Sequence, residues 1–192
     1  KEGAFMYENA LIITAKKETV EAILERIVKD DVIDFASILP ETWRYDNETS
    51  EEFAARIDAL KKTISYNPSN KTDKAYTASA KVIECIDDSK AVTRVVRFDS
   101  DFPAHDFVQL LSVRYPDCTF EYKYINKEKH CCASETYING RWDIDDIVLN
   151  DDTLDEGKTK VLAMQYAKLH YESFDKVPDE LLNKCITEVT AE

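Results

Sequence analysis

Glycine is scarce in this chain, with only Gly3, Gly140 and Gly157 among 192 residues. Loops that cradle phosphate groups need glycine, because their backbone amides approach the ligand closely and some residues adopt positive φ. Neither a P-loop nor a glycine-rich dinucleotide-binding fingerprint can be drawn on the sequence. The shortage therefore excludes nucleotide chemistry by either route, and we expect no cofactor.

Long apolar runs and a regular cysteine pattern are also missing. No stretch reaches the roughly 20 apolar residues that a membrane-spanning helix needs, so we expect no membrane partner. The cysteines are odd in number, are irregularly spaced and follow no secretion signal; they are Cys85, Cys118, Cys131, Cys132 and Cys185. This pattern favours reduced thiols and a cytoplasmic location, in a bacterial or phage-infected cell.

Positive charge is in deficit, and the formal net charge is −13. Residues 143–192 hold 13 acidic and 5 basic side chains, and so contribute −8 of that total. Such a field repels phosphate backbones and favours a basic partner, although a well-solvated surface has the same composition. We expect a protein partner with a basic surface rather than nucleic acid.

β-Branched runs alternate with amphipathic segments over most of the chain. The expected strands span residues 9–14, 76–86, 92–98, 118–125 and 131–138, and the expected helices span residues 17–29 and 103–115. The first four strands and the two helices make two strand–helix–strand units. Side by side, such units predict an α+β fold with a ferredoxin-like βαββαβ antiparallel sheet and both helices on one face. Residues 131–138 would extend this sheet by one C-terminal strand.

Two segments fall outside this sheet. Residues 41–74 indicate a helical insertion, with a capping box formed by Thr49 and Glu52. Beyond Trp142 the chain becomes rich in acids, and an acidic linker leads to two helices, at residues 158–171 and from about residue 178. We therefore expect a ferredoxin-like domain over residues 1–150. The linker and the two helices, over residues 151–192, would dock on this domain or present a surface to a partner.

An ordered set of motifs resembles a known family. The motifs are Asn9 before the first strand, DFASILP at residues 34–40, FDSDFP at 98–103, RYPDCTFEY at 114–122 and Asn139-Gly140. They resemble the YubB-like family, domains of unknown function with a ferredoxin-like fold that phages and plasmids carry. The chain departs from the family at Met6-Tyr7, where relatives have Trp-Cys, and at residues 128–132, where relatives are rich in glycine. The resemblance covers about residues 5–142 and implies a bacterial or phage setting, but no activity.

His130, Cys131 and Cys132 form the densest group of metal-type ligands. Adjacent strand residues point to opposite faces, so the three cannot converge on one ion without a bulge. Small buried strand cysteines are the better interpretation, and we predict no metal. No pattern brings His105 or His170 to a cysteine nucleophile. We therefore predict a non-enzymatic protein, with a site built from buried carboxylates as the remaining alternative.

An acidic stretch is the first candidate for a functional surface. Its residues are Arg141, Trp142, Asp143, Asp145, Asp146, Asp151, Asp152, Asp155 and Glu156. The stretch does not fit the EF-hand template, whereas acidic surfaces commonly steer basic partners. Trp142 beside Arg141 is typical of a binding hot spot, or of a hydrophobic lid that closes the last strand.

Phe120, Tyr122 and Tyr124 are the second candidate, because they alternate along one strand and so share one sheet face. On an open face such rings stack on bases, whereas under helices they form core. The RNA-binding signature is missing, and the acidic charge disfavours nucleic acid.

The primary hypothesis is a non-enzymatic protein-interaction module of phage or mobile-element origin. The resemblance makes an anti-defence or regulatory role plausible, with binding through the acidic surface. The alternative is a nucleic-acid-linked protein. It would be a binder that uses the aromatic strand, or an acidic mimic of DNA.

Overall fold

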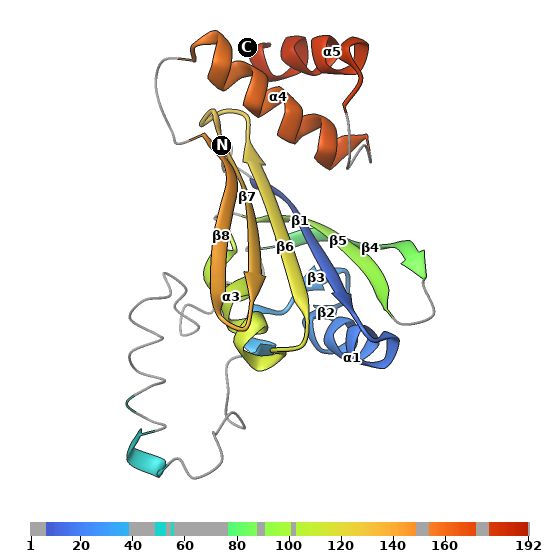
Figure 1. Ribbon diagram of the computed structural model, residues 1–192, viewed down its shortest axis with the longest axis vertical. Helices are drawn as coiled ribbons and strands as arrows, with labels where there is room; N and C mark the ends of the chain where they lie inside the picture. The colour runs from blue at the N-terminus through green and yellow to red at the C-terminus, as the bar shows by residue number, and fades with distance from the viewer. Residues whose placement is uncertain are drawn as a thin grey trace.

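A single six-stranded antiparallel sheet organises the described part of the chain, as the computed structural model in Figure 1 shows. The described residues are 7–38, 49–52, 55, 77–87, 91–100, 103–148, 154–171 and 177–191. The strands are β1 (Tyr7–Ala15), β4 (Thr77–Asp87), β5 (Val92–Ser100), β6 (Thr119–Asn126), β7 (Cys131–Ile138) and β8 (Arg141–Val148). In space they follow the order β4-β5-β1-β6-β7-β8. Together with the helices, this sheet confirms the α+β class.

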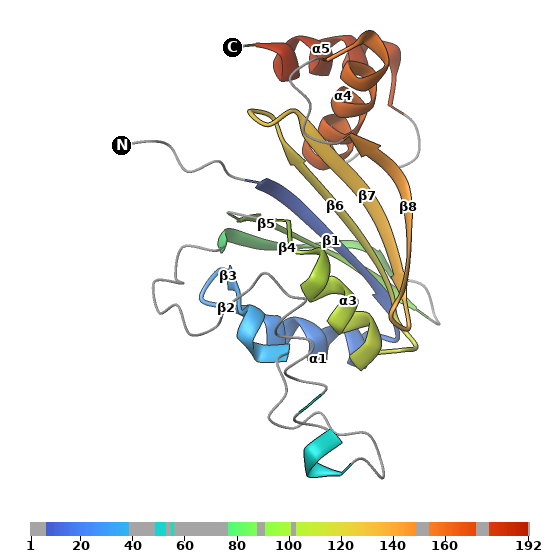
Figure 2. The same ribbon diagram turned by 90° about the vertical axis from the view of Figure 1, so that its left-hand side faces the viewer.

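One face of the sheet carries the helices α1 (Lys17–Ile27) and α3 (His105–Arg114), which lie on the same side in Figure 2. The helix α1 forms because its apolar residues recur every three or four positions, so that Val20 and Ile23 are both buried. They share a hydrophobic core with Leu11 of β1 and Leu111 of α3. We call this the first core. A short hairpin of β2 (Val28–Lys29) and β3 (Val32–Ile33) and the 3-10 helix η1 (Phe35–Ile38) follow α1.

The alternate residues of the strands build a second core on the opposite face. The helices α4 (Glu156–His170) and α5 (Asp179–Thr190) pair there, and α4 contacts β1, β6, β7 and β8. Leu162 of α4 and Leu182 of α5 join Ala10 and Ile12 of β1 in this core. Figure 2 shows the two helices across one end of the sheet. The sheet thus separates two hydrophobic layers.

The strand β8 departs from the sequence-based expectation. The expected sheet ended at residue 138, and no strand was expected in the acidic stretch after Trp142. Instead, Arg141–Val148 pairs antiparallel with β7 and adds a further strand. Trp142 is the second residue of this strand and is 55% exposed, so the interpretation as a hydrophobic lid is wrong. The sequence pattern did not indicate this strand, because Asp145 is an extra residue that interrupts the alternation of apolar and polar side chains.

Only a small part of the expected helical insertion lies within the described residues. The capping box is confirmed there. The Glu52 carboxylate accepts from the Thr49 backbone N–H at 2.9 Å, and the Thr49 hydroxyl accepts from the Glu52 N–H at 3.2 Å. The rest of residues 41–74, including Trp43 and Arg44, lies almost entirely outside the described residues.

Candidate interaction surface

A tight hairpin turn places β8 at the edge of the sheet. Asn139 and Gly140 have φ values of 50° and 75°, which suit a two-residue type I′ turn between antiparallel strands. The turn brings Arg141 opposite Ile138. The Gly140 N–H donates to the Ser112 hydroxyl at 2.9 Å, so that α3 holds the turn in place. The geometry of this turn therefore fixes where β8 starts.

An exposed apolar row runs along β8 on the face that carries α1 and α3. Trp142 is opposite Tyr137 and Ile147 is opposite Ala133, and both partners belong to the first core. Directly opposite residues of an antiparallel pair share a face. Trp142 is 55% exposed and Ile147 is 45% exposed, whereas Ile144 between them is half-buried. We call Trp142, Ile144 and Ile147 the β8 apolar row.

A β-bulge keeps this row on one face. Ser134 is opposite Asp146 and the next residue, Glu135, is opposite Ile144, so Asp145 is an extra residue in β8. Without the bulge, Ile144 and Ile147 would point to opposite faces, because strand side chains alternate. The bulge also breaks the alternation along the sequence, which explains why pattern analysis did not find the strand.

The acidic candidates divide between two elements. Asp143 and Asp145 are exposed on β8, and Asp143 pairs with Thr136 across the strands. Asp146 is in the same strand, opposite Ser134. Arg141 is exposed at its start. The structure therefore gathers Arg141–Asp146 in one edge strand, together with the β8 apolar row.

Asp155 and Glu156 begin α4 and have a local structural role there. Asp155 is the N-cap residue, and its Oδ1 accepts from the Lys158 N–H at 2.8 Å. Glu156, in the first turn, interacts favourably with the helix dipole. Asp151 and Asp152 lie outside the described residues.

Phe120, Tyr122 and Tyr124 do not form an open aromatic face. Their exposed fractions are 0%, 0% and 8%, and all three lie in the first core under α1 and α3. Bases could stack on these rings only if the helices were displaced, so the interpretation as a base-stacking surface is wrong. The rings are core residues because their side of β6 faces the helices.

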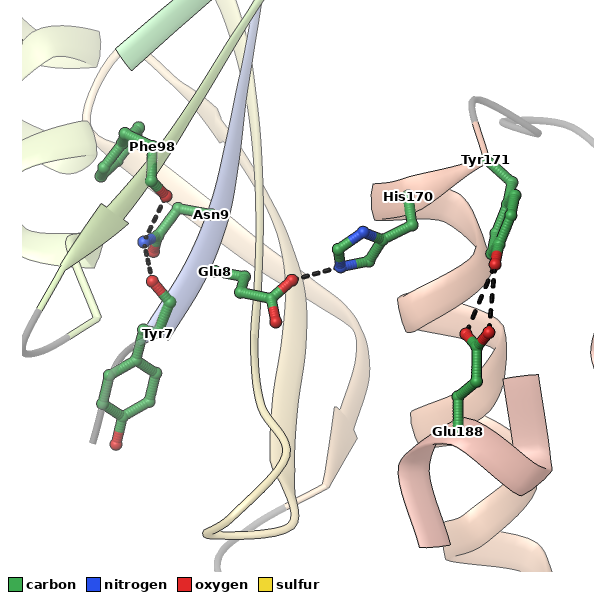
Figure 3. A network of polar contacts seen from close by, with 7 residues as sticks. All are labelled: Tyr7, Glu8, Asn9, Phe98, His170, Tyr171 and Glu188. Carbon is green, nitrogen blue, oxygen red and sulfur yellow. Dashed lines mark hydrogen bonds and ion pairs between the residues drawn. The ribbon is translucent and has the colours of Figure 1, made fainter. Parts of the chain in front are cut away.

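The Tyr122 hydroxyl belongs to a buried network that the sequence did not indicate. It donates to Asn9 Oδ1 at 2.6 Å and accepts from the Ala104 N–H at 2.6 Å. The Asn9 amide donates in turn to the backbone oxygens of Tyr7 and Phe98, at 2.8 and 3.0 Å, as Figure 3 shows. The polar residue Asn9 directly before the apolar run ALII is the one signal that could have revealed it. The network joins β1, β5, β6 and the start of α3.

A buried carboxylate lies beside this network. Glu135 is 4% exposed and accepts a hydrogen bond from the Tyr137 hydroxyl at 2.6 Å. His105 Nδ1 lies 3.7 Å from its other oxygen, although His105 itself is partly exposed. Burial, and then the nearby Glu135 charge, raises the pKa of Tyr124. The arrangement ties the first turn of α3 to β7, and the same contacts would suit a histidine base oriented by a carboxylate.

Cys131 and Cys132 lie on opposite faces of the sheet. Cys131 belongs to the first core and Cys132 to the second. Burial raises the pKa of the Cys131 thiol, against the lowering effects of Tyr7 and Lys129. Among the described residues, no group of three or more His, Cys, Asp or Glu side chains could hold a metal ion.

A polar contact fastens α4 to β1 beside the second core (Figure 3). His170 Nε2 contacts the Glu8 carboxylate, and Asp99 of β5 is opposite Glu8. Burial and then the Glu8 charge raise the pKa of Asp99, whereas His170 lowers it. The Tyr171 hydroxyl lies 3.3 and 3.4 Å from the two Glu188 oxygens and joins the end of α4 to α5. These contacts hold the helix pair on the sheet.

Comparison with protein-family models, with curated proteins and with solved structures finds no match to this chain. Within the described residues, no helix has both the length and the apolar character needed to cross a membrane.

Proposed function

We propose that this protein is a non-enzymatic interaction module that binds a protein with a basic surface through β8. The observation that carries the proposal is the two-sided character of this edge strand. Trp142 and Ile147 are exposed on one face, and Asp143 and Asp145 are exposed beside them. Apolar anchors rimmed by charge are typical of protein interfaces, where tryptophan is enriched among hot-spot residues.

The fold is consistent with this role, because the sheet that carries β8 has a hydrophobic core on each face. We propose that β4-β5-β1-β6 is a ferredoxin-like βαββαβ sheet, which β7 and β8 extend at one side. The strand order and the position of α1 and α3 on one face support this topology. The proposed phage or mobile-element setting, and with it a cytoplasmic anti-defence or regulatory role, comes from the sequence resemblance alone.

Matched variants of the purified chain can test the binding role in pull-downs from bacterial lysate. We expect wild type to enrich a basic protein at low salt. Trp142→Ala should weaken binding by about 2 kcal/mol or more, which is roughly thirtyfold in Kd. Asp143→Asn with Asp145→Asn should weaken it through lost attraction.

The control removes the same charge from another exposed site. Asp179→Asn with Glu180→Gln, at the start of α5, should leave binding unchanged. If both double variants reduce the enrichment of the partner equally, the binding surface is not β8. If wild type enriches no protein at low or at high salt, the binding role is refuted.

The alternative function is a nucleic-acid-linked protein. Of its two forms, the exposed acids of β8 support an acidic mimic of DNA. A mimic would compete with DNA for the same basic partner, and both associations would weaken steeply with salt. A direct binder would shift labelled oligonucleotide in a gel, which the burial of the aromatic strand argues against.

A further inference from the structure

The edge position of β8 leaves one side of its backbone without a neighbouring strand among the described residues. The sheet order ends at β8, whose pairing is with β7 alone in that part of the chain. An edge strand offers a row of N–H and C=O groups that an extended segment can pair with. The register is regular from Arg141 to Ile144 and shifts at the Asp145 bulge. Straight pairing is therefore available mainly over Arg141–Ile144.

Charge decides which segment fits this edge. Trp142 is on the face of the first core, whereas Asp143 is on the other face, opposite Thr136. Successive side chains of an added strand would lie in turn on the face of Trp142 and on the face of Asp143. Residues next to Trp142 would be apolar, and residues next to Asp143 and Asp145 would be basic, because opposite charges across strands are favourable.

A second copy of this chain fits the edge poorly. If the β8 strands of two copies pair antiparallel about Trp142, Arg141 of one copy lies opposite Asp143 of the other. This pairing covers only residues 141–143, because the next residue is Gly140 of the turn. A longer pairing, centred between Ile144 and Asp145, places Asp143 opposite Asp146, and like charges across strands are destabilising. Each copy also has a net charge of −13, so the copies repel one another.

We propose that β8 binds its partner by strand addition. The partner supplies an extended segment in which apolar residues alternate with lysine or arginine, and the segment pairs with Arg141–Ile144 with Trp142 as its anchor. This inference rests on the proposed function, because it specifies the partner of the same surface. The alternation follows from the strand period of two, and the basic residues follow from the acids of β8.

The experiment uses the full chain and an eight-residue peptide that alternates lysine and valine, with capped ends. A peptide of the same composition with its lysines and valines in two blocks is the matched control. Amide hydrogen exchange followed by NMR reports on each residue of β8. We expect exchange in Arg141–Ile144 to slow roughly tenfold at alternate residues with the alternating peptide alone. N-methylation of alternate peptide amides on one edge should weaken binding about tenfold, and on the other edge hardly at all.

The possible outcomes separate the two proposals. Equal, salt-sensitive binding of both peptides without slowed exchange would overturn strand addition but leave an acidic binding surface. Binding of neither peptide would overturn strand addition, and the lysate pull-down then decides the broader role independently. Sedimentation that shows a dimer of the chain alone, which Trp142→Ala dissociates, would identify a second copy as the occupant and overturn the proposal.

Discussion

Removal of the Tyr122 hydroxyl should destabilise the protein strongly, although the substitution deletes one atom. In Tyr122→Phe, two buried groups lose their partner: the Asn9 Oδ1 acceptor and the Ala104 N–H donor, each 2.6 Å from the hydroxyl. A buried polar group that is left unsatisfied costs about 1–3 kcal/mol. The two together give about 2–6 kcal/mol, a large share of the roughly 5–15 kcal/mol by which domains are stable.

Urea unfolding followed by circular dichroism measures this loss as a lower midpoint at an unchanged slope. Tyr171→Phe is the matched control. Its hydroxyl is exposed and lies 3.3 and 3.4 Å from the Glu188 oxygens, so we expect a change within about 0.5 kcal/mol. If Tyr122→Phe changes the free energy of unfolding as little as Tyr171→Phe does, the hydrogen bonds of the Tyr122 hydroxyl do not stabilise the fold.

Three further predictions concern local features. Gly140→Ala should cost about 1–3 kcal/mol in urea unfolding, because φ is +75° and the added Cβ would lie 2.7 Å from Val113 Cγ2. Asp155→Ala should cost about 1 kcal/mol and should speed hydrogen exchange in the first turn of α4, since the N-cap is lost. Burial, and then Asp117, raises the pKa of Cys118 from 9.0 to about 11, so folding favours the neutral thiol. That stability is complete below pH 9 and is lost as pH rises towards 11, and Cys118→Ala should reduce the slope of unfolding free energy in this range.

Each of these three predictions has an outcome that would contradict it. A neutral Gly140→Ala would mean that α3 and the turn adjust freely. Unchanged exchange in α4 after Asp155→Ala would mean that the cap is dispensable. An alkaline slope that Cys118→Ala leaves intact would assign the transition to other groups, such as Tyr7, whose pKa burial raises to about 12.

The local features of the fold could be predicted because their causes lie close together in the sequence. The apolar stripe of residues 17–29 indicated α1, and the run at residues 131–138 gave the bounds of β7. Thr49 and Glu52 form the capping box that their spacing indicated. In each case neighbouring residues satisfy the backbone or define a face within a few positions.

The candidate site was predictable only in part. The acids and Trp142 were identified, but β8 itself was not, because the bulge at Asp145 breaks the period of two on which strand detection depends. The network of Asn9 and Tyr122 was missed for a different reason. These residues are separated by 113 positions, and nothing local requires their contact.

The sequence by itself determined the α+β class, the local start and stop signals and the excess of negative charge in its last quarter. The tertiary structure decided which side of each strand is covered. It buried Phe120, Tyr122 and Tyr124, and left Trp142 exposed on the edge. The physical reason is that the alternation of side chains assigns strand residues to two faces but does not determine what covers each face. The cover depends on helices that dock from distant parts of the chain.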